Sequence, residues 1–555
     1  MATIQTEKKF ETIEEWNAEF ERIEEKDRKK PIWYKIAYSE SYRGIAMKHF
    51  LVAMTMLIIG GSFALMLRAQ SGVTNTGVPY VTPVVFYFQD LTDHVMAMIF
   101  GVVFDTAFGL GFYFVPLLTG TRVVKYPKLA NLGLWTATVG ILMMLAGGPQ
   151  NQYMFVFQNP LMPASNWFIG YSLMIIGEWL VMTSIIATSF NWRAPGRLMP
   201  LGVALIVMDM IQMALGNMSV FAAVMWSLAS PLGQLGINVV GVPNAEVWKA
   251  LFWYADHPLV YFGPYALMGG AAAVIPFYAR RPLFSYRLFR WMVPVLFVLG
   301  MSVYVHHIAT DPVPLILRDV FAQTSTALIA IPFAAVWLIE LATLGNPRKL
   351  KWDVGLMFIY ASIIWNIIGG IHAEPVQPSP ATDPVIHNTL WIPSHIHIMM
   401  AAFTVGGFFG LFYIIFPHIL GRAWYSNRLA MVHFWGWNIG MGMLIAAFNN
   451  AGFFGAIRRE IFWPVVYQIY YQLAAIGGWL AGLAVAAFFV NFALTVFKGK
   501  RLPVDGFPKW LRASIALERT GMRNEGYSAE NLPLLPYENS NAGSNSGGKG
   551  SNGSK

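Results

Sequence analysis

Histidine is the residue type with which this chain could carry out metal chemistry, because the sequence contains no cysteine. Thiolate metal sites, iron–sulfur clusters, covalent c-type haem and disulfides are therefore excluded, and imidazole remains as the strong ligand for soft metals. The most unusual histidines are His395 and His397, which stand one residue apart where a long apolar run begins. Successive residues of an α-helix turn by about 100°, so these two side chains point to opposite flanks of one helix. They cannot share one metal, but they can serve two sites.

A second group of histidines favours a single metal. His257 and Tyr261 are four residues apart, so their side chains meet on one face of a helix. His306 and His307 are adjacent and differ by about 100° in direction, which suits two ligands of one metal approached from the side. Three imidazoles without a thiolate or carboxylate favour copper, with zinc as the alternative on chemistry alone.

Three histidines then remain for haem: His94, His395 and His397. A haem held by two histidines is coordinatively saturated and transfers electrons, whereas a haem held by one histidine keeps an open face for a small gas. His397 with His94 would make the first kind of site, and His395 alone would make the second.

The elements that must position these residues are membrane-spanning helices. Hydrophobic residues make up 56% of the 555 residues and charged residues 12%, which is typical of an all-α membrane protein with many spans. The net charge of +9 does not indicate nucleic-acid binding, because the charges lie in loops between apolar segments. About twelve segments reach the roughly 20 residues needed to cross a lipid bilayer. They lie at about 49–67, 94–118, 129–147, 167–189, 200–227, 248–276, 290–309, 325–344, 354–372, 395–420, 430–450 and 465–497.

The loop charges predict the orientation. Lys and Arg gather after the even-numbered segments, on the side of the N-terminus, so the positive-inside rule places both termini in the cytoplasm. All six candidate ligands then fall in the outer third of the bundle at a similar depth. Ionisable groups inside a membrane are costly and usually functional, so this convergence indicates a metal or haem site.

The sequence divides into a cytoplasmic N-terminal segment (1–45), a twelve-helix core (46–500) and a cytoplasmic C-terminal segment (501–555). The last part, from about 539, is rich in Ser, Asn and Gly and is expected to be disordered. The N-terminal segment carries apolar residues at helical spacing, which predicts a short amphipathic helix exposed to solvent. These residues are Phe10, Ile13, Trp16, Phe20 and Ile23.

The combined motifs resemble subunit I of the haem–copper oxygen reductases over about 45–497. The motifs are His257-Pro258-Leu259-Val260-Tyr261, the His306–His307 pair, His395-x-His397 and the earlier His94. The resemblance implies a terminal respiratory oxidase that reduces O2 to water and couples this reaction to proton translocation. It also implies two haems of a or b type and one copper ion, CuB.

The resemblance assigns a role to each motif residue. It implies a low-spin haem between His94 and His397, a high-spin haem on His395, and copper on the remaining three histidines, His257, His306 and His307. Tyr261 matches a tyrosine that is linked to the first copper ligand and supplies an electron and a proton.

Two further matches concern the outer loops. Arg458 and Arg459 resemble a basic pair that binds haem propionates. Asp383 and His387 resemble a group near the propionates on the proton-exit route. A simple exception to the positive-inside rule for the arginines, and a plain polar loop for the other two, are the alternatives.

One departure points to a branch of the family. The mitochondrial-type subfamily has a glutamate where this chain has Leu259, so the chain looks more like the B-type (ba3-like) branch of bacteria and archaea. This implies the plasma membrane of a prokaryotic cell. However, Met268 and Ala272 stand where the B-type proton path has tyrosines. The residues that could substitute are Tyr265, Thr326 and Gln323, and further membrane-embedded carboxyls are Asp105, Glu178 and Asp209, for which a structural, hydrogen-bonded role is expected.

Partners are implied by what the chain lacks. Without cysteine it cannot hold the dinuclear copper centre that accepts electrons from cytochrome c, so either a subunit II carries that centre or a quinol is the donor. Small membrane subunits and the lipid bilayer complete the expected partners. Two other functions stay open: a nitric oxide reductase with iron in place of copper, against which Tyr261 argues, and a membrane transporter whose histidines relay protons.

Overall fold

The computed structural model describes residues 13–73, 86–147, 165–191, 199–308, 311–312, 314–373, 376–377, 379, 381–502, 511 and 517. Phe10 and the predicted tail from about 539 lie outside these residues. Within the described part of the chain, twelve helical spans are long and apolar enough to cross a membrane, which confirms the predicted all-α multi-pass fold. The spans are Tyr42–Gly72, Tyr87–Thr119, Pro127–Gly147, Ser165–Phe190, Leu201–Ala229, Ala245–Ala279, Tyr286–Ile308, Ala322–Leu344, Val354–Ala373, Trp391–Leu420, Asn427–Phe453 and Val465–Lys498.

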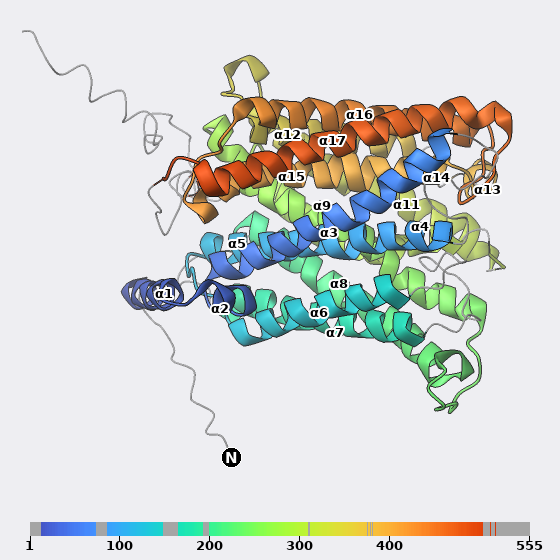
Figure 1. Ribbon diagram of the computed structural model, residues 1–555, viewed down its shortest axis with the longest axis horizontal. Helices are drawn as coiled ribbons and strands as arrows, with labels where there is room; N and C mark the ends of the chain where they lie inside the picture. The colour runs from blue at the N-terminus through green and yellow to red at the C-terminus, as the bar shows by residue number, and fades with distance from the viewer. Residues whose placement is uncertain are drawn as a thin grey trace, which may run out of the picture.

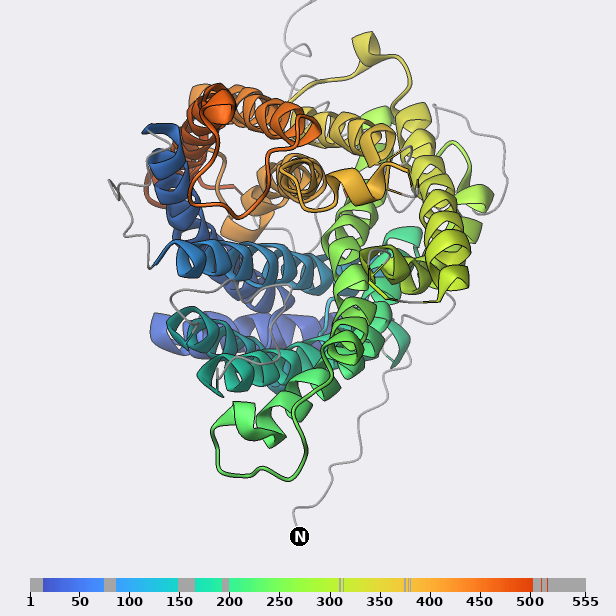
Figure 2. The same ribbon diagram turned by 90° about the vertical axis from the view of Figure 1, so that its right-hand side faces the viewer.

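The spans lie side by side in one bundle whose two ends carry different elements (Figure 1). The N-terminal helix α1 (Ile13–Arg28) and the last turns of α17 (Gln468–Lys498) lie at one end. The opposite end carries α4 (Tyr87–Met96), α13 (Asp383–Ile386) and α14 (Trp391–Ile396), and Figure 2 looks onto this end. The predicted histidine-bearing helix ends therefore gather at the end away from α1.

The other helices used below run between these two ends. They are α3 (Tyr42–Val73), α5 (Asp105–Thr119), α6 (Pro127–Gly147), α7 (Ser165–Asn191), α8 (Leu201–Ala229), α9 (Ala245–Ala279), α10 (Tyr286–Ser302), α11 (Ala322–Leu344), α12 (Val354–Ala373), α15 (Gly406–Leu420) and α16 (Asn427–Phe453).

Glycines bring neighbouring helices into backbone contact. A Cβ atom on Gly140 of α6 would lie 2.5 Å from the carbonyl oxygen of Gly170 of α7, and one on Gly440 of α16 would lie 2.6 Å from that of Gly477 of α17. Membrane helices have little hydrophobic drive to associate, because lipid tails are as apolar as their side chains. Close packing of small residues therefore holds these helix pairs together.

Two spans change from α-helical to π-helical hydrogen bonding where they pass the histidines. The π-helical segment η2 (Ala97–Phe104) begins three residues after His94, and η7 (His397–Val405) begins at His397 itself. Such π segments are rare, and they are frequently found at functional sites.

The N-terminal amphipathic helix forms as α1, but the expectation that it is exposed to solvent is wrong for its apolar face. Phe20 and Ile23 are 2% and 6% exposed. The ring of Phe20 lies 6.2 Å from that of Tyr42, and the guanidinium of Arg122 covers it at 4.0 Å. The polar side is anchored as well, since Arg43 pairs with Glu24. Burying this face against the bundle avoids leaving the aromatic surface in water.

Candidate metal centre

All six candidate ligands line one cavity of about 970 Å³. This volume is at the upper end of the roughly 300–1,000 Å³ that ligand pockets occupy. Its lining is mainly apolar, with histidines, a few other polar side chains and arginines as the exceptions. The six histidines come from four spans that are far apart in sequence: His94, His257, His306, His307, His395 and His397.

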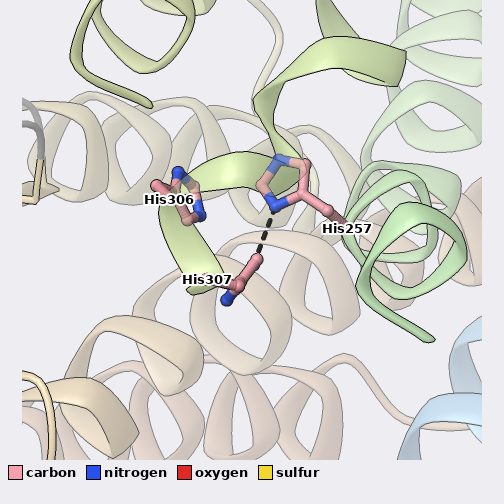
Figure 3. Close-up of side chains that lie close together, drawn as sticks. All are labelled: His257, His306 and His307. Carbon is pink, nitrogen blue, oxygen red and sulfur yellow. Dashed lines mark hydrogen bonds between the residues drawn. The ribbon is translucent and has the colours of Figure 1, made fainter. Parts of the chain in front are cut away.

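Three of these histidines form a cluster that could hold one metal ion (Figure 3). One nitrogen from each of His257, His306 and His307 lies within 4.8 Å of the other two. Nδ1 of His257 is 2.9 Å from Nε2 of His307. The other nitrogen of His257, Nε2, lies 2.8 Å from the phenol oxygen of Tyr261 and donates its N–H to that oxygen in the tautomer that leaves Nδ1 free to bind metal. His257 therefore presents Nδ1 to the cluster, and the donor set of three imidazoles fits copper.

Neighbouring side chains fix the rings of the cluster. Thr326 of α11 donates its hydroxyl proton to the carbonyl of Ala322 at 2.6 Å, so its oxygen accepts from Nδ1 of His306 at 2.9 Å. This places the proton of His306 on Nδ1 and leaves Nε2 for a metal. The ring of His307 stacks on the indole of Trp253, with centroids 3.7 Å apart and an interplanar angle of 3°. The segment that carries the histidine pair, η4 (Val303–Ile308), is a 3₁₀-helix, in which adjacent residues differ by about 120° in direction.

His94 and His397 are oriented in the way that haem ligands require. Nδ1 of His94 donates to the carbonyl of Gly60 on α3 at 2.9 Å, and Nδ1 of His397 donates to the carbonyl of Pro393 at 2.6 Å. Both rings line the cavity and interact electrostatically with each other. A backbone bond on Nδ1 fixes the tautomer and frees Nε2 as a ligand, so these two residues fit one haem.

His395 lies on the other flank of the same helix, where it interacts electrostatically with His306 of the metal cluster. Its ring is parallel to those of Trp391 and His372, at centroid distances of 5.7 and 5.8 Å. His372 is held in turn by Asn449, whose side-chain oxygen lies 2.6 Å from Nε2. His395 is thus a rigid, cavity-lining imidazole beside the cluster, which fits a second haem.

The loops at the end of the bundle away from α1 meet above the cavity. Thr389 and Ile457 form an isolated antiparallel bridge, and Arg458 donates to the side-chain oxygen of Asn388 at 3.2 Å. Nδ1 of His387 lies 3.3 Å from a carboxylate oxygen of Asp383. The four loop residues singled out in the sequence all line the cavity: Asp383, His387, Arg458 and Arg459. Glu460 lies beside them, and burial raises the pKa of its carboxyl above the usual range.

The three substitute proton-path residues take different positions. Tyr265 is fully buried, and its ring stacks on that of Tyr261 at 5.5 Å. Thr326 lines the cavity but is engaged with His306. Gln323 is half-buried and is not part of the cavity lining.

Several site residues were not identified from the sequence. Trp253, the Gly60 carbonyl and the His372–Trp391 stack are contacts between distant segments, which spacing alone does not reveal. Arg68 also lines the cavity, and its guanidinium lies 4.9 Å from the ring of Phe448. An arginine near the outer end of an apolar segment was a usable signal, because charges at that depth are costly.

Comparison with known proteins identifies the family. The family described as cytochrome c and quinol oxidase polypeptide I matches residues 44–480. Cytochrome c oxidase subunit 1 of Synechocystis is 26% identical over 83% of this chain and 84% of its own length. Quinol oxidase subunit 1 of Sulfolobus acidocaldarius is 26% identical over 78% of this chain and 86% of its own. The haem–copper oxidase subunit I+III of Aeropyrum pernix is 27% identical over 86% of this chain and 59% of its own.

A solved structure shares the fold. The chain superimposes on a haem–copper terminal oxidase, determined as a dimer by cryo-electron microscopy, with a TM-score of 0.70 and 19% identity. The match covers 89% of this chain and 94% of the other. The chain therefore belongs to the cytochrome c and quinol oxidase polypeptide I family, and it is the catalytic subunit of a terminal oxidase.

Proposed function

We propose that the chain reduces O2 to water between a high-spin haem on His395 and a copper ion, CuB, on three other histidines, with a low-spin haem between His94 and His397. The copper ligands are His257, His306 and His307. The observation that carries this proposal is the cluster itself, in which three imidazole nitrogens converge within 4.8 Å and a phenol hydroxyl bonds the first ligand at 2.8 Å. When bound, the haems and the copper supply electron transfer and the chemistry of oxygen. A nitric oxide reductase is disfavoured by the phenol of Tyr261 beside the metal cluster.

The protein's own residues then bind the cofactors, orient the metal ligands and supply protons. Tyr261 holds a proton and an electron within reach of the cluster. Arg458 and Arg459 bind haem propionates, for which their guanidinium groups have the right charge and geometry. Asp383 and His387 take up protons that leave on the outer side. Tyr265, Thr326 and Gln323 belong to the proton path, and Thr326 also orients His306.

The location, the family branch and the partners that we propose for the chain rest on its sequence. The chain is a multi-pass membrane protein, and we place it in the plasma membrane of a prokaryote with both termini in the cytoplasm, as the loop charges favour. Leu259 supports the B-type branch. We also propose that the reaction is coupled to proton translocation. Moving one charge across 100 mV costs about 2.3 kcal/mol, and oxygen reduction by a respiratory donor releases far more than this per electron. Cytochrome c or a quinol donates the electrons, and a subunit II with small membrane subunits completes the complex.

Oxygen uptake and metal content of the purified complex test this proposal. We expect O2 consumption with a reduced donor, two haems and one copper in this subunit. Turnover of nitric oxide, with non-haem iron in place of copper, would establish the reductase instead. Absence of any haem absorption would favour a transporter.

A further inference from the structure

Side chains of α8 and α9 meet at a glycine of α10, next to Tyr265, whose ring stacks on that of Tyr261. A Cβ atom placed on Gly300 of α10 would lie 2.7 Å from Nε2 and 3.1 Å from Oε1 of Gln212, and 3.1 Å from the hydroxyl of Tyr265. The amide and the hydroxyl therefore both lie against this glycine. Gly300 allows this approach because it has no side chain.

The amide of Gln212 has an unusual environment. Gln212 is 1% exposed, and neither amide atom has a hydrogen-bond partner among the described residues. Leaving a buried amide unpaired costs about 1–3 kcal/mol, so such groups are normally paired with protein or ordered water. Tyr265 is likewise fully buried, and its hydroxyl donates to the carbonyl of Leu296 at 3.2 Å. Its oxygen can still accept a hydrogen bond from an ordered water.

Asp209 extends this polar line toward the end of the bundle that carries α1. It stands three residues before Gln212 on α8, so both side chains lie on one face of the helix. Asp209 is 1% exposed, and its Oδ2 has no hydrogen-bond partner in the part of the chain that the structure describes. Asp209 also interacts electrostatically with Tyr265.

The two other candidate carboxyls are already engaged. Asp105 lies 2.6 Å from Nδ1 of His49, and Glu178 accepts from Asn217 at 2.8 Å. These two fit the structural role expected for them. Asp209 does not fit this role in the same way, because its Oδ2 has no hydrogen-bond partner among the described residues and can bind an ordered water.

The opposite side of Tyr265 is apolar. Phe333 of α11 packs against its ring at 5.5 Å, and the next residues of α9 on the way down are the buried Met268 and Ala272. Polar groups continue from Tyr265 toward α8, where the chain offers Gln212 and then Asp209.

We propose that Asp209, Gln212 and Tyr265, with ordered water at Gly300, form a proton route that reaches the cavity beneath Tyr261 from the α8 side. This inference rests on the proposed oxygen reduction, which consumes protons as well as electrons. The carboxyl of Asp209 passes a proton to water and regains one from the solvent side. The amide of Gln212 stays neutral and holds the water, and the hydroxyl of Tyr265 releases one proton as it accepts another. The electrons come from the donor of the oxidase reaction.

The test uses the purified oxidase complex with its partner subunits and its cofactors. A pH-indicator dye follows proton uptake during oxidation of the fully reduced enzyme by O2, and reduced-minus-oxidised spectra give the haem content. Asp209→Asn and Gln212→Leu should slow proton uptake and turnover by about 10²-fold, the lower end for a lost proton-transfer group. Haem spectra and the KM for the donor should not change.

Gly300→Ala tests the close approach of Gln212 and Tyr265 to α10. The new methyl group meets the flexible end of Gln212, so the helix can accept it, but it pushes the amide away from Tyr265. We expect the same slowing of proton uptake. Gly442→Ala on α16 is the matched control, because its Cβ would meet the ring of Trp365 at an ordinary 3.7 Å.

Glu340 of α11 provides the comparison that can overturn the route. It is fully buried, and neither of its carboxylate oxygens has a partner within the described residues. The α8 route is refuted if Asp209→Asn and Gln212→Leu both take up protons at the wild-type rate. This holds whether or not Glu340→Gln loses proton uptake. Failure of the proposed function is distinguishable, since the wild-type complex would then consume no O2.

Discussion

Nε2 of His257 and the phenol oxygen of Tyr261 lie 2.8 Å apart, one helical turn from each other on α9. This contact leaves Nδ1 of His257 to face His307, so one bond determines which imidazole nitrogen can bind metal. It also holds the phenol at the edge of the cavity, with Tyr265 stacked beneath it. In the proposed reaction, the metal cluster and its proton donor are therefore joined through a single side chain.

Tyr261→Phe removes the hydroxyl but keeps the ring. We expect the complex to assemble with both haems and copper, because the ring still packs against Tyr265 and Phe333. Turnover should fall by at least ~10²-fold, since a positioned proton donor is lost. Oxygen uptake normalised to haem content measures this effect, and activity close to wild type would refute the role given to Tyr261.

Thr326→Val removes the acceptor for Nδ1 of His306 while keeping the shape of the side chain. Groups that orient a metal-binding histidine contribute about 10–100-fold to metal affinity. We therefore expect copper to be lost more readily to a chelator, with haem content unchanged. Thr326→Ser, which keeps the hydroxyl, is the matched control. Equal copper retention in the valine and serine variants would contradict the predicted role.

Phe20→Ala tests the docking of α1. Truncating a buried phenylalanine costs about 3–5 kcal/mol, and here the loss falls on the contact with Tyr42 and Arg122. We expect faster protease cleavage between 13 and 41, with unchanged haem spectra because α4 and α14, which carry His94 and His395, lie at the other end of the bundle. Ala18 is exposed on the same helix, so Ala18→Ser should cleave at the wild-type rate. Equal cleavage of Phe20→Ala and wild type would show that this contact does not hold α1.

The sequence was sufficient to predict the spans and the group of histidines, because both depend on local patterns. Apolar length identifies a span, and alternate spans reverse direction, so residues near the same face of the membrane can be grouped without coordinates. The structure accordingly brings His94 and His306 to one cavity. The prediction that α1 is exposed to solvent is wrong. An amphipathic pattern does not show whether a helix lies in water or against another part of the protein.

Contacts between distant segments could not be predicted in the same way. The bond from His94 to Gly60 involves a backbone carbonyl, which any residue type could provide. The approach of Gln212 to Tyr265 depends on three helices and on the missing side chain of Gly300. Gln323 was chosen for its position on a helix, but only coordinates tell which face of that helix meets the cavity.

The division of the histidines between two haems is tested most directly by carbon monoxide difference spectra of His395→Ala and His397→Ala. Carbon monoxide binds a haem with an open face and not one held by two histidines. We expect His395→Ala to lose the haem that binds carbon monoxide, and His397→Ala to lose the other haem while keeping the carbon monoxide signal. Loss of the same haem in both variants would contradict the placement of two haems on opposite flanks of one helix.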